Sequence, residues 1–184
     1  MKPLLVFLLA LPAWGQIAIK PAAASAPAER VGVSAGKIAP AAFFTLERLL
    51  DTVLASVGGI DHPVDLLGDT RGVYLEDYGV VFSAELSLIK TPGISPFHQT
   101  ISEQERKAVH ERKLEQLPAL EKAMGEMMRT SAKSLTPVPE NQRIVLVVRL
   151  LYMHWEDTSG LPAQIMLKAD RTSAMAGRFQ TEVQ

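Results

Sequence analysis

The longest apolar run outside the first residues of the chain, Ile144–Trp155, limits the possible fold more than any other feature. It reads IVLVVRLLYMHW, is rich in β-branched and aromatic residues, and has about the length of one long strand. It is too short to cross a membrane as a helix, which takes roughly 20 residues. Because a strand that is apolar on both faces must be covered on both, the run predicts the central strand of a sheet.

Two segments predict helices that cover this sheet. In Ala41–Val57, leucines and valines recur at the spacing of one helical face. Ser102 and Glu105 stand at the spacing of a capping box, which predicts the start of a second helix. The first three turns of that helix are almost entirely polar and are expected to project into solvent. Pro118 predicts either a kink or two helices end to end.

Two hairpins complete the predicted domain. Val73–Leu88 contains a four-residue connection that ends at Gly79, and its second arm alternates between apolar and polar residues. The second hairpin pairs the central strand with Ala163–Ala169. The order helix, hairpin, helix, hairpin predicts an α+β fold with an antiparallel sheet of about four strands and two helices packed on it. Glu85 and Arg149 are expected to be neighbours on the less buried sheet face.

Both ends of the chain are expected to lie outside this domain. Residues 1–15 contain a lysine, an apolar block and small residues in the order of a secretory signal peptide, which predicts cleavage before Gln16. Residues 16–40 are rich in alanine and proline and predict a flexible tether. Residues 171–184 have no periodic pattern and are expected to fray. The single domain then spans residues 41–170, in a protein that is periplasmic or secreted.

Composition removes several functional classes. The formal net charge is −1, so no broad basic field is present and nucleic-acid binding is not expected. The chain has no cysteine, which excludes disulfides, thiol nucleophiles and thiolate metal sites. No apolar run beyond the expected signal has membrane-spanning length, so the processed protein is not expected to be an integral membrane protein. The four histidines stand at unrelated spacings, and neither a metal site nor a cofactor is expected.

The candidate catalytic residues are His154, Glu156 and Asp157, which end the apolar run or follow it. Imidazole and carboxylate groups are the usual general acids and bases of enzymes. The alternative is ordinary turn chemistry, because polar residues are common where a strand enters a turn. Gly32–Gly36 also matches the nucleophile elbow G-x-S-x-G. That motif requires a preceding strand and a following helix, whereas here an alanine- and proline-rich segment precedes it, so we exclude it.

Two groups of residues are candidates for binding. The polar half of the second helix has too little apolar surface to be held by packing, so it is expected to be solvated or to face a partner. Its candidate residues are Glu103, Arg106, Lys107 and His110. The first hairpin contributes Arg71, Tyr74 and Tyr78.

Three short stretches, RGVYL at 71–75, YGVVF at 78–82 and WED at 155–157, resemble motifs of a group of uncharacterised exported bacterial proteins. The resemblance covers about residues 41–169. It implies export and brings no activity with it.

Two functional hypotheses follow. The first is a non-catalytic binding or assembly domain of the bacterial cell envelope, which presents a sheet edge or the charged helix to an envelope or extracellular protein. The second is a small exported hydrolase that uses His154, Glu156 or Asp157 as acid–base residues. The lack of a complete catalytic constellation favours the first.

Overall fold

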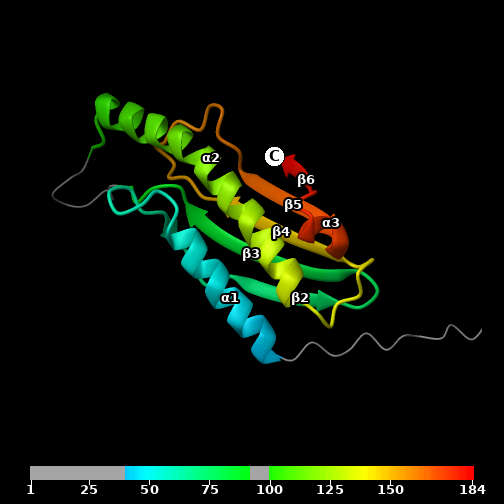
Figure 1. Ribbon diagram of the computed structural model, residues 1–184. Helices are drawn as coiled ribbons and strands as arrows, with labels where there is room; N and C mark the ends of the chain where they lie inside the picture. Colours follow the sequence, from blue (N-terminus) through cyan, green and yellow to red (C-terminus); the bar gives the residue numbers. More distant parts are fainter. Residues whose placement is uncertain (1–39, 92–99) are drawn as a thin grey trace, which may run out of the picture. The chain divides into compact units, whose positions relative to one another are not determined.

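The computed structural model describes residues 40–91 and 100–184 of the 184-residue chain. The expected signal peptide, its cleavage site and the tether up to residue 39 lie outside the described residues. The described part is an α+β domain in which two long helices lie on one face of a mixed, six-stranded sheet (Figure 1). No helix in the two described ranges combines the length and the apolar character needed to span a membrane.

The sheet has the strand order β1–β3–β4–β5–β6, and β2 pairs with the same edge of β3 as β1 does. The strands are β1 (Asp65–Leu66), β2 (Arg71–Leu75), β3 (Gly79–Ser87), β4 (Arg143–Leu150), β5 (Gln164–Asp170) and β6 (Gln180–Val183). All neighbours are antiparallel except β3 and β4, which are parallel. The sequence predicts about four strands, all antiparallel. Both expectations are wrong, because the sheet has six strands and β3 pairs with β4 in parallel.

The parallel pair follows from the helix between its strands. Parallel strands need a crossover of a dozen or more residues, usually a helix, and α2 (Glu103–Ser134) supplies it. The apolar run does form a central strand, because β4 lies between β3 and β5. It leaves the sheet after Leu150, however, where β3 also ends, so the strand is shorter than expected.

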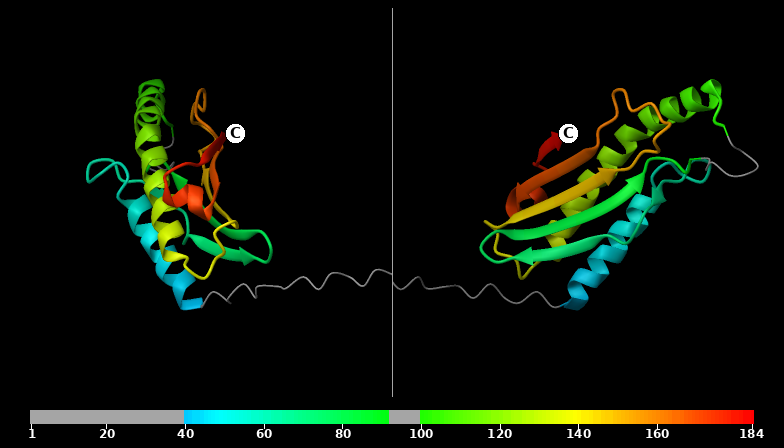
Figure 2. Two further views of the ribbon diagram at one scale, coloured as in Figure 1. Left: turned by 45° about the vertical axis from the view of Figure 1, so that its right-hand side comes forward. Right: turned by 180° about the vertical axis from the view of Figure 1, so that it is seen from behind.

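The two long helices bury their apolar faces against the same side of the sheet, as Figure 2 shows. The helix α1 (Pro40–Ala55) buries Leu46, Leu50 and Leu54. The helix α2 starts at the expected capping box, since the Ser102 hydroxyl accepts from the Glu105 amide (3.2 Å) and the Glu105 carboxylate accepts from the Ser102 amide (2.8 Å).

Pro118 lies inside α2, which continues as one helix, so the alternative of two separate helices is wrong. Proline inside a helix costs about 3 kcal/mol. Burial of Leu120, Met124 and Met127 in the core directly after the proline offsets that cost.

The C-terminal residues do not fray. They form α3 (Arg171–Met175) and β6, which pairs with β5. The Asp170 side chain caps α3 by accepting from the Ser173 amide (2.8 Å). The Arg171 guanidinium donates to the carbonyl oxygen of residue 132, within α2 (2.9 Å), and to that of residue 138, beyond its end (3.2 Å). These contacts are made across the fold, so a search for local periodicity could not find them.

The outer edge of β2 is covered by α1. The Thr70 amide donates to the Asp51 carboxylate (2.8 Å) and the Gly72 amide donates to the Glu47 carboxylate (2.7 Å). Edge amides that are satisfied in this way cannot pair with an additional strand.

The other face of the sheet carries no long helix (Figure 2). Glu85 and Arg149 are register partners on adjacent strands, and their side chains form the expected ion pair at 3.4 Å. Both side chains are more than half exposed, at 51% and 62%, so the pair is worth at most about 1 kcal/mol.

Candidate functional site

Two groups of predicted site residues meet at one end of the sheet. The connector, which we define as residues 151–163 between β4 and β5, lies beside the N-terminal half of α2 (Figure 1). The His110 ring nitrogen Nδ1 is 2.9 Å from the backbone oxygen of Asp157. The polar half of α2 is expected from the sequence to project into solvent. The connector packs against it instead, so only part of this half is free.

A buried ion pair joins the helix to the connector. The Lys113 ammonium donates to the Glu156 carboxylate, and the two side chains are 0% and 1% exposed. Within the described part of the chain, the second carboxylate oxygen of Glu156, Oε1, has no hydrogen-bond partner. A charge that leaves water without a partner costs several kcal/mol, so each of these two residues depends on the other.

Tyr152 extends this pair into a small network. Its ring lies 4.8 Å from the Lys113 ammonium, and its hydroxyl donates to the backbone oxygen of Pro162 (2.5 Å). Burial lowers the pKa of Lys113, and the hydrogen bond and charge of Glu156 oppose that shift. Burial, together with the negative charge of Glu156, raises the pKa of Tyr152 to about 12. At neutral pH Tyr152 is therefore a neutral hydrogen-bond donor.

Above the buried pair, two hollows open to solvent. The first, of about 460 Å³, is lined by Glu103, Arg106, His154, Trp155, Glu156 and Asp157. The second, of about 310 Å³, is lined by Glu103, Arg106, Lys107, His110, Glu111 and Asp157. The residues predicted for catalysis and those predicted for binding on α2 thus share one surface.

Two of the three catalytic candidates are engaged in other contacts. The Glu156 side chain is buried in its ion pair with Lys113. Hydrogen bonds from Ser159, whose amide lies 2.9 Å from the Asp157 carboxylate, lower the pKa of Asp157 and favour its ionised form. His154 is exposed. A catalytic pair needs groups that reach the substrate in complementary protonation states, and Glu156 would first have to leave Lys113.

Tyr74 and Tyr78 of the first hairpin lie at the opposite end of the sheet, where β4 begins. Arg71 starts β2 and lies level with the middle of β4, because its register partner Ser83 pairs in turn with Val147. Arg71 pairs with Asp69 in solvent (3.5 Å). The Tyr74 hydroxyl donates to the Gln142 side chain (3.1 Å), and the Tyr78 ring lies 5.7 Å from the Arg143 guanidinium. The two tyrosines hold the start of β4, and none of the three residues lines the hollows at the connector.

Lys113 was missed among the candidate residues, although the sequence carries a signal for it. Val109, Lys113, Gln116 and Leu120 follow one helical face, and all four are buried. A lysine and a glutamine within an apolar stripe require buried partners. The Gln116 side chain finds one in the backbone oxygen of His62 (2.7 Å).

The described residues contain no group of three or more histidine, aspartate or glutamate side chains placed to hold a metal ion. His98 lies outside the described residues. No protein-family model, curated protein or solved structure matches the chain.

Proposed function

We propose that this chain is a non-catalytic binding domain of the bacterial cell envelope, exported after cleavage before Gln16. It binds a protein partner with the outward side of the N-terminal half of α2 and the connector beside it. The observation that carries the proposal is the buried Lys113–Glu156 ion pair. A buried ion pair is often no more stabilising than apolar residues of the same volume. A role in fixing the connector on the helix accounts for its presence better than stability does.

Fixing the connector gives the charged end of α2 one defined shape. A surface that is ordered before binding loses less conformational entropy when a partner docks. Its exposed side chains alternate in sign, with Glu103 84%, Lys107 77% and Glu111 60% exposed. A surface of mixed sign fits a protein with complementary charged groups better than it fits a polyanion or an anionic membrane.

One observation favours the second hypothesis, an exported hydrolase. His154, Glu156 and Asp157 line the same hollow of about 460 Å³. The ion pair of Glu156 weighs against it, and His154 and Asp157 would then be the residues exposed to a substrate.

A charge exchange on the proposed surface tests the binding function. In Lys107→Glu/Glu111→Lys the net charge and the i, i+4 pair of the helix are both retained, while the charges offered to a partner are inverted. The matched control is Glu121→Lys/Lys122→Glu, which inverts two exposed charges further along the same helix. Partner recovery from the envelope fraction, with a photo-crosslinker at position 103, is the measurement.

We expect recovery with the wild-type protein and the control, and a loss of at least ten-fold with Lys107→Glu/Glu111→Lys. The variant His154→Ala, which changes an exposed side chain, should fold as the wild type does. Equal recovery with both charge exchanges would contradict the binding surface. Turnover of an envelope substrate that His154→Ala abolishes in a folded protein would establish the hydrolase instead.

A further inference from the structure

A cavity of about 540 Å³ lies at the end of the sheet opposite the connector. It is open to solvent and is lined by the start of β4, the end of β5 and the segment from α3 to β6. Its lining residues include Asn141, Arg143, Lys168, Asp170, Ser173 and Arg178. The volume is within the range of about 300–1,000 Å³ that is typical of small-molecule sites.

The lining is dominated by positive charge. Arg143, Lys168 and Arg178 come from three separate segments, whereas Asp170 is the one acidic residue of the lining, so the lining has a net charge of +2 (three cations less one anion). Lys168 donates to Glu182, which compensates part of its charge. With the Lys168–Glu182 pair set aside, the two arginines and Asp170 leave a net charge of +1 (two cations less one anion).

Asp170 supplies one negative charge, which interacts with Arg178, and it also caps a helix. Its carboxylate accepts from the Ser173 amide (2.8 Å) as the cap of α3. This hydrogen bond lowers the pKa of Asp170 and keeps the carboxylate ionised and oriented towards the backbone.

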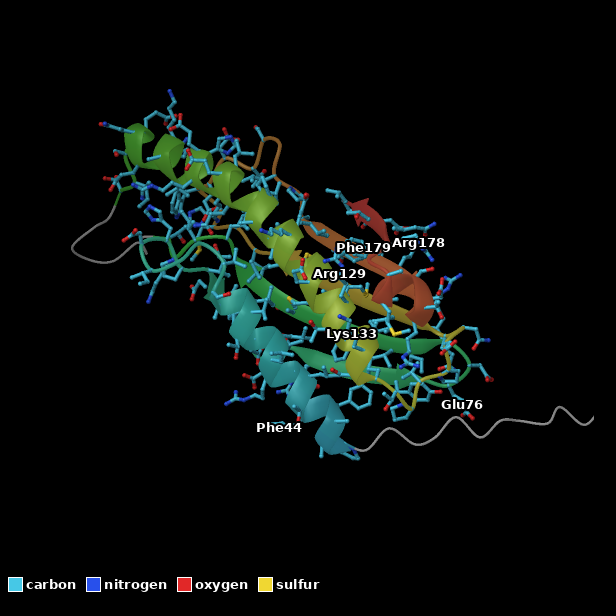
Figure 3. The ribbon with its side chains drawn as sticks, in the orientation of Figure 1. Phe44, Glu76, Arg129, Lys133, Arg178 and Phe179 are labelled. Atoms are coloured by element: carbon cyan, nitrogen blue, oxygen red, sulfur yellow. The ribbon has the colours of Figure 1, made fainter. Side chains whose placement is uncertain are left out.

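The Arg143 side chain and the Arg178 backbone each have a neighbouring contact, since the Arg178 amide donates to the backbone oxygen of Ser173 (2.9 Å). The Arg143 guanidinium lies 5.7 Å from the Tyr78 ring, a distance that permits a cation–π contact. Arg178 precedes Phe179, which packs against the core, and Figure 3 labels both beside the C-terminal strand. A Cβ atom at Gly125 of α2 would lie 3.1 Å from the Phe179 ring, so the ring sits closely on the helix and fixes the backbone of Arg178.

We propose that this cavity binds an anion that carries a phosphate group, as a soluble phosphomonoester or as the headgroup of a lipid. The guanidinium fork of arginine matches the oxygens of a phosphate, to which it can donate two parallel hydrogen bonds. A phosphomonoester carries a charge of about −1.5 to −2 at pH 7, which complements the lining. Asn141 and Ser173 add neutral hydrogen-bonding groups. The inference does not rest on the proposed function, which uses the other end of the sheet.

Titration calorimetry of the purified protein tests this site with inorganic phosphate and phenyl phosphate as probes, at constant ionic strength in chloride. We expect saturable binding that Arg143→Gln and Arg178→Gln each weaken at least ten-fold. The control is Arg149→Gln, which removes an exposed arginine from the same sheet outside this cavity and should change the affinity less than two-fold. Thermal unfolding checks each variant. If a glutamine variant fails to fold, Arg143→Lys and Arg178→Lys replace it, since they keep the charge but lose the fork.

Sedimentation with phosphatidylcholine vesicles, with and without phosphatidic acid, separates the two sources of phosphate. Binding of phenyl phosphate without preference for phosphatidic acid assigns a soluble ligand. Binding of phosphatidic acid vesicles that Arg178→Gln abolishes assigns a lipid headgroup. Absence of both kinds of binding, or binding that the variants of Arg143 and Arg178 leave within two-fold, would overturn the proposal.

Discussion

Replacing Lys113 by methionine should lower the free energy of unfolding by about 3–5 kcal/mol, the usual cost of breaking a buried ion pair on one side. The Glu156 carboxylate is 1% exposed and would lose its cation. One of its oxygens already has no hydrogen-bond partner within the described residues, so no existing contact takes over. Methionine fills much of the volume of the lysine stem. The decrease in the free energy of unfolding therefore arises more from the unpaired charge of Glu156 than from a cavity.

The double variant Lys113→Met/Glu156→Leu removes both charges and supplies the decisive comparison. It should lie within about 1 kcal/mol of the wild type or exceed it, because apolar replacement of a buried pair is often neutral or stabilising. The matched control is Glu85→Ala/Arg149→Ala with its two single variants, whose coupling energy should be at most about 1 kcal/mol because that pair is exposed.

Urea unfolding followed by far-UV circular dichroism measures these differences as shifts of the midpoint at constant slope. A loss below about 1 kcal/mol in Lys113→Met would show that Glu156 finds water or another partner. A double variant as unstable as Lys113→Met would show that packing, rather than charge, holds the connector.

Two further predictions concern titration and backbone geometry. In an absorbance titration at 295 nm, one of the three tyrosines should ionise near pH 12, and this step should be absent in Tyr152→Phe. Because the folded state raises this pKa, the contribution of Tyr152 to stability is complete below about pH 10 and is lost as the pH rises through 12. Absence of a separate step near pH 12 in the wild-type protein would contradict the burial of Tyr152. Gly79→Ala should destabilise the protein in the urea assay, because Gly79 has φ 133° and its Cβ would lie 1.9 Å from the backbone oxygen of Arg143; an unchanged midpoint would contradict this close approach.

Several elements of the fold could be predicted because each depends on the residue pattern of one short segment. The helix α1, the capping box at Ser102 and the β2–β3 hairpin each follow from spacing within one segment. Alternation along β3 identifies the faces of that strand, and Glu85 and Arg149 were paired because each is the only charge within its predicted strand. Neither pattern carries information on whether two strands are parallel. The parallel pairing and the C-terminal elements depend on contacts between distant segments, which a single segment does not encode.

The candidate site shows the same division. Residues 103–110 and 154–157 were identified separately from their chemistry, and the structure brings them together because β4 ends beside α2. Lys113 was missed because its partner, Glu156, lies 43 residues away in the chain. A charged residue within an apolar helical stripe is the local sign of such a partner.

The parallel pairing of β3 with β4 also determines when the domain can fold. Glu85 and Arg149 are 64 residues apart in sequence, although they are register partners. The β2–β3 hairpin can form from local contacts, but the other edge of β3 stays open until α2 has crossed the sheet and β4 has arrived. Closing such a loop costs chain entropy before any contact offsets it, which slows folding. A fragment that ends with α2 would leave the long edge of β3 unpaired, so this edge stays unpaired in a nascent chain until residue 150 is available.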